Sequence, residues 1–288
     1  MLQAAMAEPD QTSLTETTIT GPRTRRWVLE CGECGECAEF DSHRIARLGL
    51  EEAVAPYRRV RMQPAGSFFL ATTEGEGRIL LDGKWQRVTA GSLFMAPPRV
   101  LNAFYAVGSK AWRFAWLRYT EPPYVRPLVG AGSPVRAAAG GAELARCIAG
   151  LRAEWSAARE PRVLHHWVSL VHALAARAAQ PGTADDKLAA LWATVEQSLD
   201  QLWSLEKLAA QMHSSPEALR KRCLRELGRS PVQHVTYMRM QRAQHLLESR
   251  KDKLEVIAGL VGFTDALTFS RAFKRWIGCT PGDYRQRH

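Results

Sequence analysis

The sequence predicts an α+β chain in which an antiparallel β-barrel with attached helices precedes an all-α domain. Between Tyr57 and Tyr119, short β-branched and aromatic runs are separated by Gly, Pro or Asp, which is typical of an antiparallel barrel or sandwich. From Lys187 onwards, apolar residues recur at helical spacing together with helix caps and stop signals. The length of 288 residues and the 46% hydrophobic content are sufficient for two globular domains.

The strongest local pattern is the run LEVIAGLVGFTDALTFSRAFKRWIGCTPGDYR, from Leu254 to Arg285. Its first helix should end at Gly262, because glycine supplies the positive φ that a tight turn requires. Asp265 is a favourable N-cap for a second helix, and Gly278 followed by Pro281 predicts where that helix ends. The apolar spacing divides this second helix into an inward face of Phe269, Ala272, Phe273 and Trp276 and an outward face of Ala266, Leu267, Ser270, Arg271 and Lys274.

The same pattern occurs about fifty residues earlier, in the run LEKLAAQMHSSPEALRKRCLRELGRSP from Leu205 to Pro231. Aligning the two copies places Ser215 on Asp265 as N-caps and Gly228 on Gly278 as stop signals. Agreement in caps, core positions and stops is hard to produce by chance, so we interpret each copy as a helix-turn-helix. The outward-facing residues of the earlier copy include Glu217, Arg220 and Lys221.

Two helix-turn-helix units joined by one helix, Val232 to Ser249, strongly resemble the DNA-binding domain of the AraC/XylS family of transcription regulators. The resemblance covers about Lys187 to Arg285 and requires both motifs, in order, with a connecting helix of the right length. It implies that the outward faces of the two recognition helices enter successive major grooves of double-stranded DNA, about 34 Å apart. Lys221 and Cys223 depart from the family pattern, in which an Arg and a bulky apolar residue are usual.

The charge distribution fits a polyanionic partner. The formal net charge is +10, and from Lys187 onwards seventeen Lys and Arg residues stand against ten Asp and Glu residues. A solvated basic surface would explain the charge equally well, so the paired motifs, rather than the charge, favour DNA as the partner.

Seven runs between Tyr57 and Tyr119 predict the barrel: RRVRM, SFFLATT, GRILLDG, WQRVTA, SLFMAP, NAFYAV and WRFAWLRY. The segment Leu81 to Lys84 predicts a hairpin turn. GEGRILLDGKWQRVTAGSLFMAPP, followed by WRFAWLRY, resembles the cupin-like sensor barrel at the N-terminus of many AraC-type regulators. This resemblance depends on the Gly and Pro positions and on Trp112 and Trp116.

The run WRFAWLRY places Trp112, Phe114 and Trp116 on one face, because side chains alternate along a strand. The family resemblance implies that aromatic residues on this strand and near the preceding Pro-rich turn contact a small-molecule effector. By position these ligand-binding residues are Phe104, Phe114 and Trp116, with Arg59 or Arg61 from the first strand. The alternative is that the aromatic residues simply fill a small barrel, and the sequence does not separate the two.

After Pro134 helical periodicity returns in AELARCIAGLRAEW and RVLHHWVSLVHALAARAA. Such helices can pack on the barrel and, as in the family, join two copies into a homodimer; burial within one monomer is the alternative. The predicted organisation is a mobile arm over residues 1–24, a cupin-like sensor and dimerisation domain over 25–180, a linker over 181–186, and an AraC-type double helix-turn-helix domain over 187–288.

The segment CGECGECAEFDSH spaces Cys31, Cys34 and Cys37 by two residues each, and His43 follows a short loop later. Thiolates at this spacing can share one tetrahedral zinc ion with a histidine. Structural zinc usually takes its second pair of ligands from farther away, so an exposed loop or a redox-sensitive thiol cluster is the alternative. No other cofactor is expected.

We expect the chain to be a sequence-specific, effector-responsive transcription activator, which binds double-stranded DNA, RNA polymerase and a small molecule and forms a homodimer. A cupin-type metal enzyme is disfavoured, because no histidine occurs between Arg44 and Leu164. A non-specific architectural DNA-binding protein is disfavoured by the varied outward residues of the recognition helices. No run approaches the roughly 18 apolar residues of a membrane span, and no export signal is visible, so we expect a cytoplasmic protein.

Overall fold

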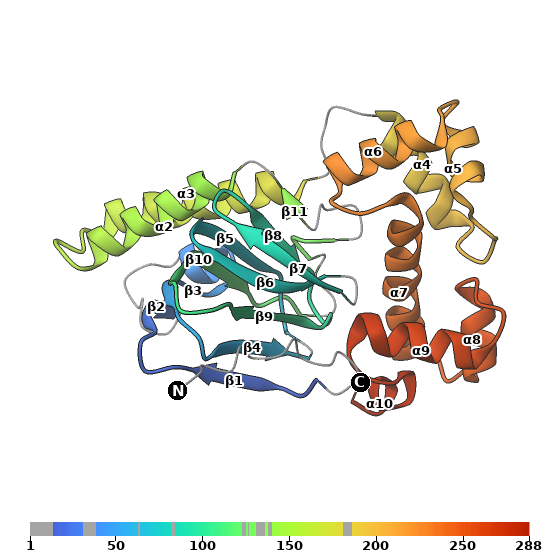
Figure 1. Ribbon diagram of the computed structural model, residues 1–288, viewed down its shortest axis with the longest axis horizontal. Coiled ribbons are helices and arrows are strands. Elements are labelled where there is room, and N and C mark those ends of the chain that lie inside the picture. The colour runs from blue at the N-terminus through green and yellow to red at the C-terminus, as the bar shows by residue number, and fades with distance from the viewer. Residues whose placement is uncertain are drawn as a thin grey trace. The chain divides into compact units, whose positions relative to one another are not determined.

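The computed structural model describes residues 14–30, 39–62, 64–81, 84–122, 125, 127–130, 136–137, 140–180 and 186–287. Contacts divide the chain into two compact units, one formed mainly by residues 15–180 and the other mainly by 181–288. The first unit contains the strands, and the described elements of the second unit are all helices (Figure 1). The predicted α+β class, with an antiparallel β domain followed by an all-α domain, is confirmed.

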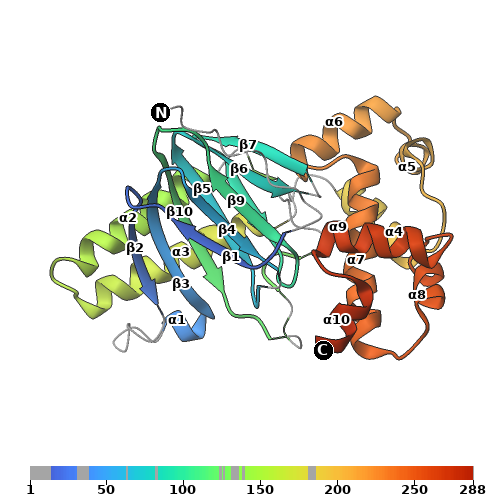
Figure 2. The same ribbon diagram turned by 60° about the horizontal axis from the view of Figure 1, so that its bottom comes forward.

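Two antiparallel sheets form the framework of the first unit (Figure 2). In spatial order, the first sheet consists of β1 (Thr17–Thr20), β4 (Tyr57–Arg61), β9 (Asn102–Ala106), β6 (Glu76–Leu81) and β7 (Lys84–Thr89). The second consists of β11 (Arg136–Ala137), β8 (Leu93–Ala96), β5 (Phe68–Glu74), β10 (Trp112–Tyr119), β3 (Ile45–Ala53) and β2 (Arg25–Glu30). The three helices of this unit are α1 (Glu39–Ser42), α2 (Gly141–Trp155) and α3 (Pro161–Ala179) among the described residues.

All seven runs predicted as strands between Tyr57 and Tyr119 are strands, and Leu81 pairs with Lys84 as a two-residue hairpin requires. Strands β2 and β3 were not predicted from the sequence. Strand β3, IARLGLEEA, contains few β-branched residues, but it pairs along its length with β10 on one side and β2 on the other. Its strand conformation is therefore a consequence of its neighbours rather than of local propensity.

Strand β1 corrects the expectation of a mobile arm over residues 1–24. Residues Thr17–Thr20 pair antiparallel with β4, and Thr18 lies opposite Arg59. A four-residue edge strand without strong alternation gives little local signal, because its hydrogen bonds all go to a segment about forty residues away. The expectation is therefore wrong for these four residues.

The side chains of β10 point alternately into two different hydrophobic cores. Trp112, Phe114 and Trp116 join an aromatic core with residues of both sheets, which confirms that they share a face. Ala115 and Leu117 point the other way, into a core shared with α2 and α3. Both helices therefore cover the second sheet on the side away from the aromatic core (Figure 1).

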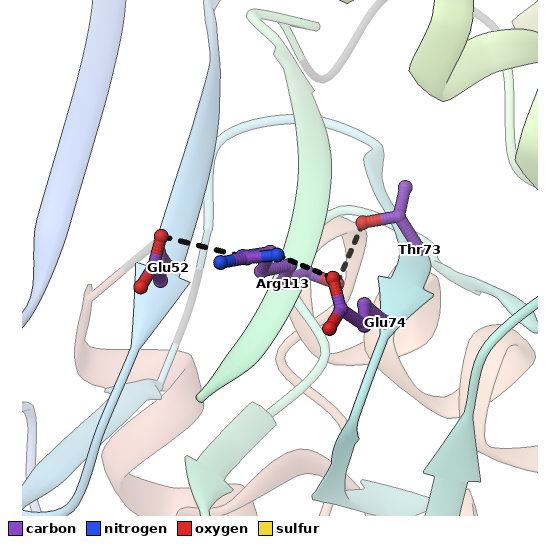
Figure 3. Close-up of polar contacts among 4 residues, drawn as sticks. All are labelled: Glu52, Thr73, Glu74 and Arg113. Carbon is purple, nitrogen blue, oxygen red and sulfur yellow. Dashed lines mark hydrogen bonds and ion pairs between the residues drawn. The ribbon is translucent and has the colours of Figure 1, made fainter. Parts of the chain in front are cut away.

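Arg113 links three strands at one end of the second sheet (Figure 3). Its guanidinium group donates to Glu52 of β3 at 3.3 Å and to Glu74 of β5, and Thr73 donates to its carbonyl oxygen at 3.0 Å. Arg113 and Glu74 are solvent-exposed and Glu52 is half-buried, so these ion pairs contribute little to stability.

The second unit contains seven helices among its described residues. They are α4 (Asp186–Gln197), α5 (Leu205–Gln211), α6 (Pro216–Glu226), α7 (Pro231–Ser249), α8 (Leu254–Leu260), α9 (Ala266–Ile277) and α10 (Pro281–Arg287). The predicted connecting helix is α7, which contacts α5 and α6 as well as α8, α9 and α10 (Figure 1). Among the described residues, no helix has the length and apolar character needed to cross a membrane.

Candidate functional site

The second helix-turn-helix comprises α8, a turn and α9. Across the turn, the Phe263 amide donates to the Ala258 carbonyl at 2.8 Å, and Gly262 has a φ of 77°, as its position predicted. Asp265 caps α9 by accepting hydrogen bonds from the Thr268 amide at 2.7 Å and the Thr268 hydroxyl at 2.8 Å. These hydrogen bonds lower the pKa of the Asp265 carboxyl group, which is therefore ionised at the positive end of the helix.

Helix α9 is oriented as the apolar spacing predicted. Phe269, Phe273 and Trp276 are buried, and Gly278 ends the helix with a φ of 96°. On the opposite side, Leu267 is 60% exposed. The other predicted DNA-binding residues of α9 are Arg271 and Lys274, which are exposed, and Ala266 and Ser270, which are half-buried. Their contact with DNA stays a prediction.

The first helix-turn-helix repeats the backbone of the second. The Ser214 amide donates to the Ala209 carbonyl at 3.0 Å, which matches the bond across the other turn. His213 takes the place of Gly262 and has a φ of 49° although it is not glycine. Ser215 caps α6 by accepting from the amide three residues further on at 3.2 Å. The two motifs therefore share their turn and capping geometry as well as their sequence pattern.

The outward face of α6 carries the three residues that the sequence analysis assigned to DNA. Glu217, Arg220 and Lys221 are exposed, and the Glu217 carboxylate lies 3.8 Å from the cationic groups of both basic residues. Such pairs within a helix contribute only about 0.2–0.5 kcal/mol, so a phosphate could replace the carboxylate at little cost. Cys223 is fully buried, and burial raises the pKa of its thiol to about 12. It is therefore a small residue of the hydrophobic core.

Arg239 of α7 connects the two motifs. Its guanidinium group donates to the carbonyl oxygens of Leu199 at 3.1 Å and Gln201 at 2.7 Å, in the loop that precedes α5. The same group lies over the Phe263 ring, 5.7 Å from its centroid, in the turn of the second motif. These contacts fix the turn of one motif against the loop that leads into the other. The sequence showed a basic residue here but could not show its partners.

The first unit contains a cavity of about 640 Å³, which we call the arginine cavity. Its described lining residues include Arg59, Arg61 and Trp116, which the sequence analysis named. Phe104 and Phe114 are each 1% exposed and belong to the aromatic core, where their rings lie 6.1 Å apart. For these two residues the structure favours packing, and their contact with a ligand stays an unsupported prediction.

Several residues of this cavity were not predicted from the sequence. Arg47 and Glu51 come from β3, which was not recognised as a strand, and Arg118 comes from the end of β10. Alternation along β10 placed Arg118 on the face of Trp116, and this was the only signal in the sequence that pointed to it.

The predicted zinc ligands cannot be assembled from the described residues. Cys31, Cys34 and Cys37 lie outside the described residues. The His43 ring stacks on His172, with centroids 4.1 Å apart, and partial burial lowers the pKa of His43. In the part of the chain that the structure describes, no three His, Cys, Asp or Glu residues could together hold a metal ion. The zinc site stays a prediction.

Two family models match the chain. Residues 208–287 match a helix-turn-helix domain, and residues 64–191 match an AraC-like ligand-binding domain. The chain belongs to the AraC/XylS family of transcription regulators. The match over residues 208–287 includes α6 and α9, and the match over residues 64–191 includes Trp116 and Arg118 of the arginine cavity.

Curated relatives resemble this AraC/XylS-family chain over different lengths. The uncharacterised HTH-type transcriptional regulator YidL of Escherichia coli K12 is 25% identical, over 73% of this chain and 72% of YidL. The MmsAB operon regulatory protein of Pseudomonas aeruginosa is 27% identical, over 83% of this chain and 81% of that protein. The RCS-specific HTH-type transcriptional activator RclR of Escherichia coli K12 is 33% identical, over 34% of this chain and 35% of RclR. This chain is accordingly a DNA-binding transcription regulator with a ligand-binding domain.

Proposed function

We propose that this AraC/XylS-family regulator is an effector-responsive transcription activator that reads DNA sequence with the outward faces of α6 and α9. The observation that carries the proposal is the repeated construction of these two helices. Each begins at a side-chain N-cap, buries one apolar face and exposes basic residues on the other. Both are held by α7 and its Arg239 within one compact unit.

The outward face of α9 suggests two roles. Arg271 can donate two hydrogen bonds to a guanine edge in the major groove, which distinguishes one base pair from another. Lys274 lies one turn further along the helix and suits a phosphate, which supplies affinity without sequence preference. Leu267, exposed near the start of the helix, can contact a thymine methyl group.

Regulation would proceed by population shift. A small molecule bound in the ligand-binding domain would favour one arrangement of the two units, or of two copies joined through α2 and α3, over another. The DNA-bound arrangement would then contact RNA polymerase and raise transcription. The similarity to RclR, a transcriptional activator, supports activation as the direction of regulation. No catalytic step belongs to this proposal.

Selection of bound sites from random DNA tests the proposal against non-specific binding. A sequence reader should enrich a site with two conserved segments about one helical turn apart, and should bind it about 10³-fold or more tightly than random DNA at physiological salt. An architectural protein would enrich no common site, and its affinity would depend steeply on salt for every sequence. Transcription from a promoter that carries the selected site then decides between activation and repression.

A further inference from the structure

We propose that the arginine cavity binds a small organic carboxylate that also carries a hydroxyl or amino group. This inference rests on the proposed function and names the chemical class of its effector. The observations that carry it are the charge of the cavity wall, the buried nitrogen and oxygen atoms that lack partners there, and a flat aromatic surface beside them.

Positive charge predominates in the cavity wall. Its described residues include three glutamates, Glu16, Glu30 and Glu51, and a larger number of arginines, which are Arg26, Arg47, Arg59, Arg61 and Arg118. Glu30 pairs with Arg47 at 3.2 Å, and Glu16, which also accepts a hydrogen bond from the Met62 amide at 2.7 Å, acts electrostatically on Arg118. Five arginines against three glutamates still leave an excess of two positive charges in the described wall.

Arg59 and Arg61 present hydrogen-bond donors without protein acceptors. The Nη1 atom of each is buried and donates to no residue that the structure describes. Burial, followed by the nearby charge of Arg118, lowers the pKa of Arg61 to about 9, although Tyr57 and Glu51 act in the opposite direction. A carboxylate offsets this cost of burial, because its two oxygens match the paired N–H groups of a guanidinium.

Cation–π contacts help to position these two arginines. The Cζ atom of Arg59 lies 5.0 Å from the centroid of the Tyr57 ring, and that of Arg61 lies 4.7 Å from the Phe68 centroid. A cation–π contact involves no oxygen acceptor, so the Nη1 donors of both groups still need one. An anion can therefore bind the arginines where these contacts already position them.

Trp116 supplies an apolar surface beside the arginines. It lies opposite Gly49 in the pairing of β10 with β3, and a Cβ atom at residue 49 would come within 3.0 Å of the indole ring. Glycine thus lets the ring lie against the β3 backbone. The Trp116 Nε1 atom is buried and donates to no described residue, so it is a further donor that lacks an acceptor at this wall of the cavity.

Glu51 explains the second functional group of the ligand. Its side chain is 6% exposed, and its carboxylate interacts with the Tyr57 phenol, whose pKa burial and then Glu51 raise. The buried Oε2 atom meets no donor of a described residue at hydrogen-bond geometry, so it keeps an open acceptor position. An acceptor in this position favours a ligand hydroxyl or amine and disfavours a second negative charge. A neutral sugar would leave the excess arginine charge unpaired, and inorganic phosphate would leave both Glu51 and the Trp116 surface without a partner.

Calorimetric titration of the full chain tests the ligand class with defined probes. The carboxylate probes are 4-hydroxybenzoate and gluconate. Their uncharged counterparts are 4-hydroxybenzamide and glucose. Inorganic phosphate is the control anion that has no carbon skeleton. We expect at least one carboxylate to bind with one site per chain, at least about tenfold more tightly than its uncharged counterpart and than phosphate. Equal binding of the uncharged counterpart, tightest binding of phosphate, or no carboxylate binding at millimolar concentration would overturn the proposal.

Substitution of one arginine on each face of β4 tests which face of the strand binds the carboxylate. Arg61→Gln should weaken carboxylate binding by more than about tenfold, whereas Arg58→Gln, which removes the same charge from the opposite face of the strand, should not. If Arg61→Gln fails to fold, Glu51→Ala replaces it, since that variant lacks the side-chain acceptor and should bind 4-hydroxybenzoate and unsubstituted benzoate alike where the native chain prefers the hydroxylated ligand. Unchanged affinity in Arg61→Gln, or unchanged preference in Glu51→Ala, would contradict the assignment.

The same preparations separate this proposal from the proposed function. DNA binding to the selected site is measured without any carboxylate, on the native chain and on Arg61→Gln. Specific DNA binding together with failed carboxylate binding means that only the effector class is wrong. Carboxylate binding without any preferred DNA site means that the proposed function is wrong while the cavity assignment holds.

Discussion

Gly262 lies directly against Arg239, so that a Cβ atom at residue 262 would come within 2.5 Å of the arginine Nη2 atom. The same Cβ atom would lie 2.4 Å from the Leu199 carbonyl oxygen, to which Arg239 donates. One glycine therefore serves two purposes. It provides the positive φ of the second helix-turn-helix turn, and it leaves room for the arginine that ties this turn to the first motif.

Gly262→Ala should therefore destabilise the second unit. The positive φ alone costs about 1 kcal/mol for a residue with a side chain, and displacement of Arg239 adds to this loss. Urea unfolding measures the change. Gly259→Ala is the matched control, because Gly259 lies in α8 with nothing within 4 Å of an added Cβ atom. That substitution should raise stability by up to about 1 kcal/mol, and equal effects of the two would contradict this account.

Arg271→Ala should lower affinity for the selected DNA site by about 1 to 3 kcal/mol and remove the preference for one base pair. Lys274→Ala should weaken specific and random DNA alike and reduce the salt dependence of binding. Arg87→Ala, which removes an exposed arginine of β7, is the control for charge alone. Should Arg271→Ala reduce specific and random binding equally, Arg271 contacts phosphate rather than a base.

Trp116→Ala and Trp112→Ala should behave differently, although both residues lie on one face of β10. Trp112 is fully buried in the aromatic core, and its truncation should cost about 3–5 kcal/mol of unfolding free energy. Trp116 borders the arginine cavity, so its truncation should cost less but abolish carboxylate binding. Thermal unfolding and calorimetry of both variants check this, and equal stability losses would indicate that Trp116 is merely a core residue.

His234 should make the stability of the second unit depend on pH. Burial, followed by the charge of Arg229, lowers its pKa to about 3, from 6.5 in an unfolded chain. The unfolded chain therefore binds more protons between these values, so stability is present above about pH 6.5 and is lost at up to about 1.4 kcal/mol per pH unit as the pH falls towards 3. His234→Phe should flatten this dependence, measured by urea unfolding between pH 7 and pH 4, whereas His245→Gln on the exposed side of α7 should not.

The cysteine segment is tested by metal analysis of protein purified without an affinity tag. If Cys31, Cys34, Cys37 and His43 hold zinc, the native chain should contain close to one zinc ion, and Cys34→Ser should lose it. A matched Cys147→Ser variant, which changes a half-buried helical cysteine, should keep the metal. Zinc-free protein would leave thiol oxidation or an exposed loop as the remaining interpretations.

The sequence by itself determined the cap, turn and stop of the second helix-turn-helix. The N-cap at Asp265, the turn at Gly262 and the stop at Gly278 depend on hydrogen bonds and dihedral angles within a few residues, so local chemistry was enough to predict them. The inward face of α9 followed from spacing alone, because a helix repeats every 3.6 residues whatever surrounds it.

The tertiary structure alone decided the composition of the arginine cavity. Alternation along β10 predicted the face of Trp116, but it could not show that Glu51 of β3 and Arg59 of β4 would line the same space. The strand β3 itself depends on hydrogen bonds to β2 and β10, about twenty and sixty-five residues away in the sequence. Contacts between such distant segments are set by strand pairing and packing, which local propensity does not encode.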